Sequence, residues 1–181
     1  VSQRAVAINI SAKTKSSGRP MTDSRKSPPS VWTNPWHFLA FGFGAGSLSK
    51  APGTWGSLAA LPFIPLLQLL PSWGYVLVVG LSLLFGIWLC GRVATDLGVH
   101  DHGGIVWDEI VGRWITRWLV PAGWQWLLLG FLLFRFFDIL KPWPISWLDR
   151  QVHGGLGIML DDVLAGVFAW LVLQGVFYWV S

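Results

Sequence analysis

Charged residues are scarce in this chain. They make up 12% of its 181 residues, whereas hydrophobic residues make up 53% and tryptophan alone occurs 14 times. A soluble domain usually contains about 25% charged residues. No charged residue occurs between Lys50 and Arg92. This shortage argues against an ordinary soluble domain and favours an integral membrane protein with aromatic residues at the lipid–water boundaries.

Cysteine is also nearly absent, and several phosphate-handling motifs are missing. Cys90 is the only cysteine, so no disulfide can form within the chain. Asp96 stands where the loop of a cysteine phosphatase needs an arginine. The glycines at 42–46 do not have the dinucleotide-binding spacing, and Lys50 lacks the flanking residues of a P-loop. The aspartate signatures of phosphoaspartyl phosphatases and of CDP-alcohol phosphotransferases do not occur either.

The charges that are present are unevenly distributed. Six of the 13 basic residues lie in the first 26 positions, and eight of the nine acidic residues lie between Asp96 and Asp162. We expect residues 1–30 to form a disordered basic tail and residues 31–181 to form a membrane-embedded helical domain. A basic flank on the cytoplasmic side explains the tail better than nucleic-acid binding does, so we expect no nucleic-acid partner.

The long uncharged stretch is expected to contain two membrane-spanning helices. A helix needs about 20 residues to cross the hydrocarbon, which predicts spans at roughly Trp55–Leu70 and Trp73–Cys90 with a turn at Pro71. The apolar segment Trp32–Gly46, broken by Pro35, looks interfacial. The fold class expected is all-α, a multi-pass helical bundle.

The next segment is predicted to be a helical hairpin. Ile105–Val120 and Trp124–Leu140 can both be helical, and Pro121 to Gly123 is a turn signal. In an antiparallel hairpin, positions whose numbers sum to about 244 face each other. Both outer ends of the hairpin then lie on one side of the membrane, about 20 Å from the turn at 1.5 Å rise per residue.

This hairpin would gather acidic and basic residues at one end. Asp108 and Glu109 would lie near Arg135, with Asp138 one turn away. Pro142 and Pro144 should stop the return helix after Lys141. A glycine-rich loop, 153–157, then leads to a last helix at Ile158–Val180, with Asp161 and Asp162 in about its first turn.

Such a cluster of carboxylates is typical of a magnesium site. Mg²⁺ takes oxygen ligands, usually one or two carboxylates with waters and a substrate phosphate. Arg135 and Lys141 nearby would suit a phosphate ester. The alternatives are ordinary helix pairs, Glu109 with Arg113 or Asp138 with Lys141, and acidic residues that simply favour a helix start.

Two further motifs could contact a substrate or a metal. His100, Asp101 and His102 allow a zinc site with His153 as a third ligand, although we favour magnesium and treat His102 and His153 as substrate contacts. Thr54 and Ser57 lie where a helix start could hold a phosphate. The equal alternative for Thr54 is a plain N-cap.

Four motifs in order resemble the phosphatidylglycerophosphatase A family, from about Asn34 to the C-terminus. They are PGTWGSLAAL at 52–61, HDHGGIVWDEIVG at 100–112, FRFFDILKPWPI at 134–145 and HGGLGIMLDDVLAG at 153–166. The resemblance implies a membrane enzyme of phospholipid biosynthesis that hydrolyses phosphatidylglycerophosphate to phosphatidylglycerol and phosphate with Mg²⁺. It places the active site at the cytoplasmic face of the bacterial inner membrane.

The same resemblance implies roles for the residues singled out above. Arg135 and Lys141 would contact the phosphate. The acidic residues would serve the metal and the chemistry: Asp108, Glu109, Asp138 and Asp162 as catalytic residues, and Asp108, Glu109, Asp161 and Asp162 as metal ligands. The rival hypotheses are a small membrane transporter that uses intramembrane carboxylates and a structural subunit that uses its glycines for helix packing.

Overall fold

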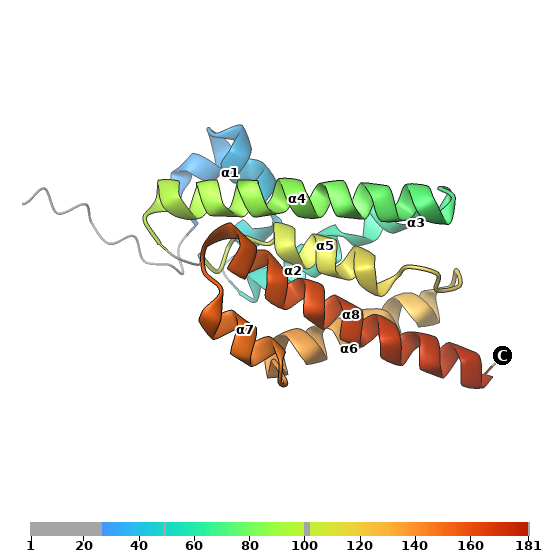
Figure 1. Ribbon diagram of the computed structural model, residues 1–181. Helices are drawn as coiled ribbons and strands as arrows, with labels where there is room; N and C mark the ends of the chain where they lie inside the picture. Colours follow the sequence, from blue (N-terminus) through green and yellow to red (C-terminus); the bar gives the residue numbers. More distant parts are fainter. Residues whose placement is uncertain (1–26, 49, 100–101, 181) are drawn as a thin grey trace, which may run out of the picture.

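The computed structural model describes residues 27–48, 50–99 and 102–180, and all regular structure within these ranges is helical (Figure 1). This confirms the all-α class. The basic segment 1–26 lies outside the described residues, so the expected disorder there stays a prediction. The helices are η1 Pro29–Trp32, α1 Pro35–Ala40, η2 Ala45–Ser47, α2 Pro52–Ala59, η3 Leu61–Phe63, α3 Ile64–Gln68, α4 Ser72–Leu97, α5 Trp107–Thr116, α6 Trp124–Leu140, α7 Ile145–Gln151 and α8 Gly154–Val180.

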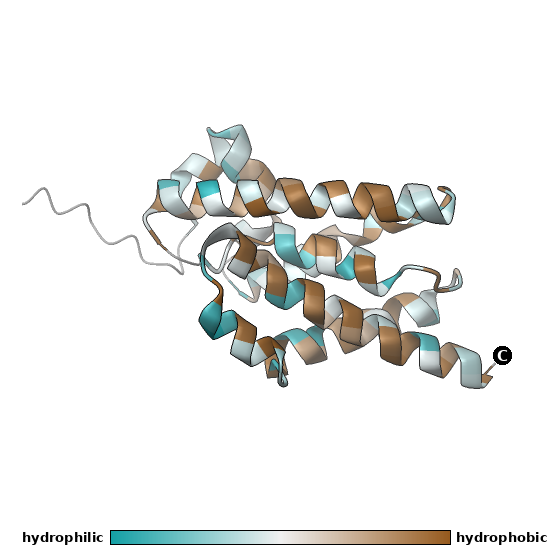
Figure 2. Cartoon of the chain, in the orientation of Figure 1, coloured by the Kyte–Doolittle hydropathy of each residue, from teal (hydrophilic) through white to brown (hydrophobic). Residues whose placement is uncertain are grey.

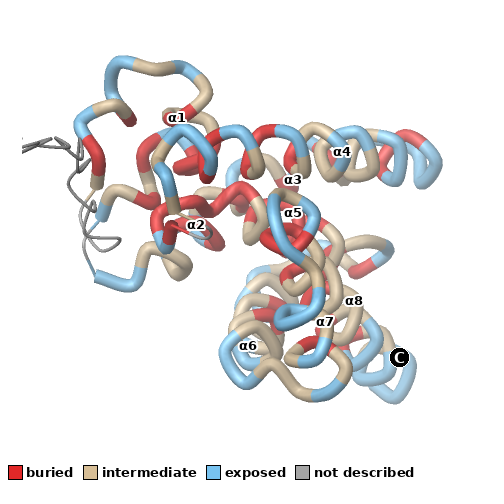
Figure 3. Tube along the Cα trace, turned by 60° about the vertical axis from the view of Figure 1, so that its left-hand side comes forward, coloured by how far each residue is buried: buried red, intermediate tan, exposed pale blue. Residues whose placement is uncertain are grey.

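Two of these helices, α4 and α8, are long and apolar enough to cross a membrane. They have 26 and 27 residues, more than the roughly 20 that a bilayer core requires. Apolar residues recur along the length of both helices on the side in view (Figure 2). Helix α5 packs against both of them and is mostly buried (Figure 3). The two candidate spans therefore flank a short, buried central helix.

The first predicted span, Trp55–Leu70, is wrong. The chain there is divided into α2, η3 and α3. Pro62 and Pro65 lie in this stretch, and a proline inside a helix removes a hydrogen bond and clashes with the preceding turn. Helix α2 instead lies against the start of α5, where a Cβ on Gly56 would overlap the side chain of Val106.

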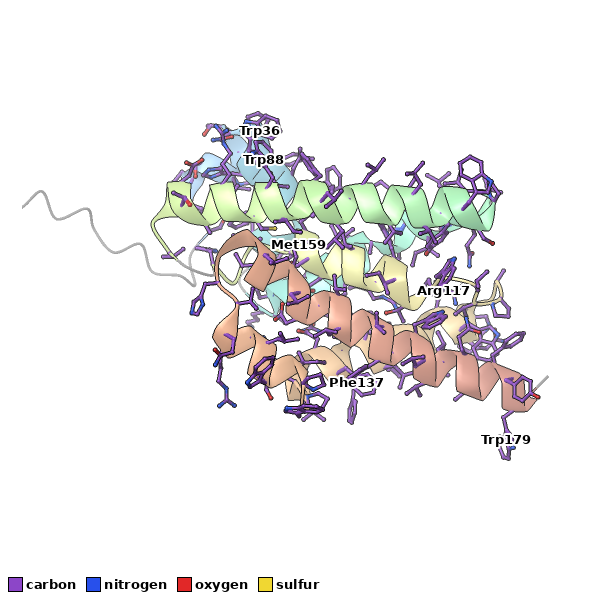
Figure 4. The ribbon with its side chains drawn as sticks, viewed as in Figure 1. Trp36, Trp88, Arg117, Phe137, Met159 and Trp179 are labelled. Atoms are coloured by element: carbon purple, nitrogen blue, oxygen red, sulfur yellow. The ribbon has the colours of Figure 1, made fainter. Side chains whose placement is uncertain are left out.

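The helix predicted for the second span, Trp73–Cys90, is confirmed and is longer than expected. Helix α4 continues to Leu97 and ends where Gly98 takes a left-handed conformation with φ 68°. Near this end, Trp36 of α1 meets Trp88 of α4 edge-to-face at 5.0 Å between ring centroids (Figure 4). The segment around α1 is therefore attached to one end of the span.

The predicted hairpin is confirmed, with a shorter first helix. Arg135 Nη1 lies 3.3 Å from Glu109 Oε2, and the two numbers sum to 244 as expected. Helix α5 ends at Thr116, and the chain turns after it, with Leu119 at a positive φ of 57°. Helix α6 ends as predicted at Leu140, where Lys141 adopts a left-handed conformation ahead of Pro142.

The glycine-rich segment before the last helix was expected to be a loop, but it is part of the helix. Helix α8 begins at Gly154, so Asp161 and Asp162 lie about two turns inside it rather than in the first turn. Close packing explains why glycines are needed: a Cβ on Gly155 would overlap the backbone of Ile87 in α4.

Helices α5 and α8 cross at their glycines. A Cβ on Gly166 would lie 2.5 Å from the carbonyl oxygen of Gly112, and a Cβ on Gly112 would lie 2.7 Å from the carbonyl oxygen of Asp162. The two helices run in the same direction across the view (Figure 1). Asp108 and Asp162 each precede a crossing glycine by one helical turn, so this contact places the two aspartates side by side.

Adding one methyl group at this crossing tests its importance. We expect Gly166→Ala to lower the thermal unfolding midpoint in detergent because the new Cβ would meet backbone. Gly175→Ala is the matched control, since a Cβ there meets no atom within 4 Å, and the change should add up to about 1 kcal/mol of helix stability. Equal midpoints for the two variants would show that the helices do not cross closely at Gly166.

Candidate active site

Five acidic side chains from three helices gather near one end of the bundle. Ligand oxygens of Asp138 in α6 and of Asp161 and Asp162 in α8 all lie within 4.8 Å of one another. Asp108 and Glu109 of α5 are close enough to Asp162 to repel its negative charge. The structure therefore brings together all five acidic residues that the sequence singled out.

Two cations lie between these carboxylates. Arg135 Nη1 is 2.6 Å from Asp138 Oδ2 and 3.3 Å from Glu109 Oε2. Lys141 Nζ is 2.6 Å from Asp161 Oδ2 and 3.1 Å from Asp149 Oδ1. Each cation joins two acidic residues, so its charge is shared rather than held by one partner.

The alternative helix pairs considered from the sequence do not form. Lys141 turns to Asp161 and Asp149 instead of Asp138. Arg113 points away from Glu109, and its Nη2 donates to the carbonyl oxygen of Leu127. The acidic residues thus interact mainly across helices.

The cations leave part of the cluster without compensation. Oδ1 of Asp161 and Oδ1 of Asp162 are buried, and neither finds a hydrogen-bond partner among the described residues. Asp162 is only 2% exposed. A buried, unpaired carboxylate oxygen costs several kcal/mol. A set of closely spaced carboxylate oxygens with free lone pairs fits a hard divalent cation such as Mg²⁺.

Helix α2 forms another wall of the site. The buried hydroxyl of Ser57 donates a hydrogen bond of 3.0 Å to Glu109 Oε2. A Cβ on Gly53 would overlap the carboxylate of Glu109. Thr54 lies inside the helix and the N-cap is Ala51, so the N-cap alternative for Thr54 is wrong. Substrate contact by Thr54 and Ser57 stays a prediction.

The two histidines singled out from the sequence lie outside the acidic group. His102 is buried, its ring lies 5.3 Å from that of Phe41, and its Nδ1 accepts from the Gly104 amide. His153 is exposed, between α7 and α8. Their proposed partners His100 and Asp101 lie outside the described residues. Over the described part of the chain, the group able to share a metal ion contains aspartates alone.

Asp149 is the residue that sequence reasoning missed. It lies in α7, and its carboxylate joins Asp161 in holding Lys141. The sequence places Asp149 between Pro144 and the glycines without a charged motif around it, and the structure shows that a short helix there returns the chain to Lys141.

Burial and neighbouring charges shift the pKa values at the site. Burial raises the pKa of Glu109 to about 7, although Arg135 and the Ser57 hydroxyl favour its ionised form. Burial alone would lower the pKa of Lys141, but Asp161 and Asp149 outweigh this and raise it. Lys141 therefore stays charged at neutral pH, whereas Glu109 can exchange a proton there.

The raised pKa of Glu109 predicts a pH dependence of stability. The folded state keeps this proton up to about pH 7, whereas the ordinary value is 4.5. The free energy of unfolding of the wild type should therefore fall relative to that of Glu109→Gln as pH rises from 4.5 to about 7. Above about pH 7 this difference should not change further. Thermal unfolding midpoints in detergent with a chelator, compared at several pH values, measure this. A difference that does not change with pH would contradict it.

The chain matches a known protein family over most of its length. The family model described as Phosphatidylglycerophosphatase A matches residues 38–177. The chain is 53% identical over 150 residues to Phosphatidylglycerophosphatase A of Escherichia coli strain K12, covering 82% of this chain and 85% of that protein. It is 50% identical over 148 residues to the Haemophilus influenzae protein of the same name, covering 81% and 91%.

A third relative carries a different name. The chain is 40% identical over 143 residues to a putative phosphatidylinositol-3-phosphatase of Bacteroides thetaiotaomicron, covering 75% of this chain and 89% of the relative. No solved structure matches. The family match over most of the chain, together with the two relatives at half identity or more, shows that this chain belongs to the phosphatidylglycerophosphatase A family.

Proposed function

We propose that this chain hydrolyses the terminal phosphate of phosphatidylglycerophosphate, giving phosphatidylglycerol and inorganic phosphate. Water supplies the oxygen that the released phosphate gains, and the lipid glycerol oxygen takes up a proton. The observation that carries the proposal is the buried carboxylate cluster with Arg135 and Lys141, found in a chain 53% identical to a phosphatidylglycerophosphatase. This is the reaction expected from the sequence.

The residues that would hold Mg²⁺ are Asp138, Asp161 and Asp162, with Asp108 beside them. When bound, Mg²⁺ supplies positive charge that stabilises the phosphoryl oxygens as negative charge moves between them. Asp138 replaces Glu109 in the ligand set expected from the sequence, because the oxygens that lie within 4.8 Å of one another among the described residues belong to Asp138, Asp161 and Asp162 and not to Glu109. The unpaired oxygens of Asp161 and Asp162 support this assignment.

The protein's own cations would position the phosphate. The guanidinium of Arg135 lies between α5 and α6, and Lys141 follows the last residue of α6. Both would offset charge on the non-bridging oxygens. Glu109, oriented by Ser57 and Arg135, is the carboxylate best placed outside the aspartate group to accept a proton from the attacking water.

We further propose that the protein resides in the bacterial inner membrane with this site facing the cytoplasm. Helices α4 and α8 provide two spans, and the basic segment 1–26 suits the cytoplasmic side. The acidic cluster lies about two turns inside α8. The lipid tails can therefore stay in the bilayer while the phosphate reaches the carboxylates.

Phosphate release tests the proposed reaction. Purified protein in detergent should release phosphate from phosphatidylglycerophosphate. Asp162→Asn should lower the rate by about 100-fold or more, the size of loss typical when one group that stabilises the transition state is removed. Asp96→Asn is the matched control, since its carboxylate is 42% exposed and contacts His37 and Arg92 instead. A fully active Asp162→Asn would remove that residue from the site.

The substrate comparison should include phosphatidylinositol 3-phosphate, because a relative is named for that lipid. Faster release from phosphatidylinositol 3-phosphate would overturn the proposed substrate. Ion flux in sealed vesicles without phosphate release would instead favour the transporter hypothesis.

Metal binding can be measured without turnover. Five clustered carboxylates repel one another, so Mg²⁺ should raise the thermal unfolding midpoint of the wild type and a chelator should lower it. In Asp162→Asn the repulsion is smaller, so the midpoint in chelator should be higher than that of the wild type, and the response to Mg²⁺ should be weaker. An equal response to Mg²⁺ in both proteins would contradict the ligand role of Asp162.

A further inference from the structure

A second group of buried charges lies towards the other end of α5. Arg113 and Arg117 are one helical turn apart and are 0% and 1% exposed. Arg117 is about 12 Å from Glu109 along the helix direction, at 1.5 Å per residue. Across the described residues, no carboxylate lies within 4 Å of either guanidinium. These two arginines therefore carry buried positive charge that no carboxylate of the described residues neutralises.

Their hydrogen bonds are also incomplete. Nη2 of Arg113 donates to the Leu127 carbonyl oxygen and Nη2 of Arg117 donates to the Pro121 carbonyl oxygen, each at 3.1 Å. Nε and Nη1 of both arginines are buried, and they find no acceptor within the described ranges. A buried guanidinium that has one carbonyl acceptor and no carboxylate nearby is unfavourable. An anion reaching Arg117 would relieve this cost.

A polar cavity of about 320 Å³ is present at Arg117. Its polar wall is held in place by hydrogen bonds: the Tyr75 hydroxyl donates to the Trp114 carbonyl oxygen, and the Gln68 amide donates to the Val120 carbonyl oxygen. Arg117 lies at the end of the bundle near the start of α4 (Figure 4). The cavity is lined by Arg117, Gln68, Ser72, Tyr75, Trp118 and Val120, among others.

An apolar groove adjoins this cavity. It has a volume of about 330 Å³ and shares Tyr75 and Trp118 with the polar cavity. Its remaining walls come from α4, α5 and α8, so it runs between the two candidate spans. These residues are Val76, Val79, Gly80, Ile115, Val167 and Trp170.

We propose that the cavity and groove together bind one anionic phospholipid at the end of the bundle opposite the acidic cluster. The phosphodiester would lie in the cavity against Arg117, and one acyl chain would lie in the groove between α4 and α8. The unneutralised arginines select a lipid with net negative charge. The adjoining groove selects a lipid over free phosphate, because only a lipid gains by covering apolar surface there.

Photo-crosslinking tests this site separately from the phosphatase reaction. The probe is phosphatidylserine with a diazirine in its acyl chain, in phosphatidylcholine nanodiscs containing the full-length protein. Phosphatidylserine is anionic but carries no terminal phosphate monoester. Labelling of residues 75–80 and 167–170 is divided by labelling of residues 176–180, which are mostly exposed on α8 and report general lipid contact.

Two variants and a control separate the site from general lipid contact. Arg117→Gln should lower the labelling ratio by about tenfold, the loss of a charge-assisted hydrogen bond, while Arg117→Lys should retain part of it. Gly80→Phe should block the groove without disturbing the fold, because a Cβ at Gly80 meets no atom within 4 Å. Arg150→Gln, at an exposed arginine of α7, should behave as the wild type.

Three outcomes would overturn the proposal. They are an unchanged ratio in Gly80→Phe, an unchanged ratio in a folded Arg117→Gln, and equal labelling by a phosphatidylcholine probe. If inorganic phosphate abolished the labelling and Gly80→Phe did not change the labelling ratio, Arg117 would be assigned to a free anion instead.

Discussion

The close crossing of α5 and α8 at Gly112 and Gly166 is the contact on which the site depends. Side chains at the crossing would separate the helices, because each added Cβ would meet the backbone of the other helix. With glycine at both positions, Asp108 and Asp162 stand next to each other one turn away. The glycines thus act through backbone distance: they set how near the acidic residues of two helices can come.

Around this crossing the charges are arranged in two zones. At one end, Arg135 and Lys141 each join two carboxylates and still leave buried oxygens of Asp161 and Asp162 without partners. Towards the other end, Arg117 is buried without a described carboxylate nearby. Among the described residues, the first zone has too little positive charge for its carboxylates, and the second has too little negative charge for its arginine. The first zone suits a metal ion and the second suits the phosphate of a lipid.

The hairpin of α5 and α6 followed from local sequence, and so did the end of α6. The turn residues 121–123 set the centre of the hairpin, and the rule that facing positions sum to about 244 then predicted that Glu109 faces Arg135. Other local patterns misled. The uncharged stretch 55–70 has the length of a span, but Pro62 and Pro65 divide it, and α2 turns its Ser57 to Glu109. The glycines at 154–157 suggested a loop, but they are helical because their lack of side chains lets α8 lie against α4.

By itself, the sequence determined the all-helical class, the membrane setting, the family resemblance and the set of acidic and basic residues at one end. These follow from composition, from the lengths of the apolar stretches between turn residues, and from four motifs that are each short and local in the chain. Only the tertiary structure decided which carboxylates share a space, that Asp149 shares Lys141 with Asp161, and that Arg117 is buried beside a groove. Such pairings join residues far apart in sequence, and they depend on the distance and angle between helices, which local patterns do not specify.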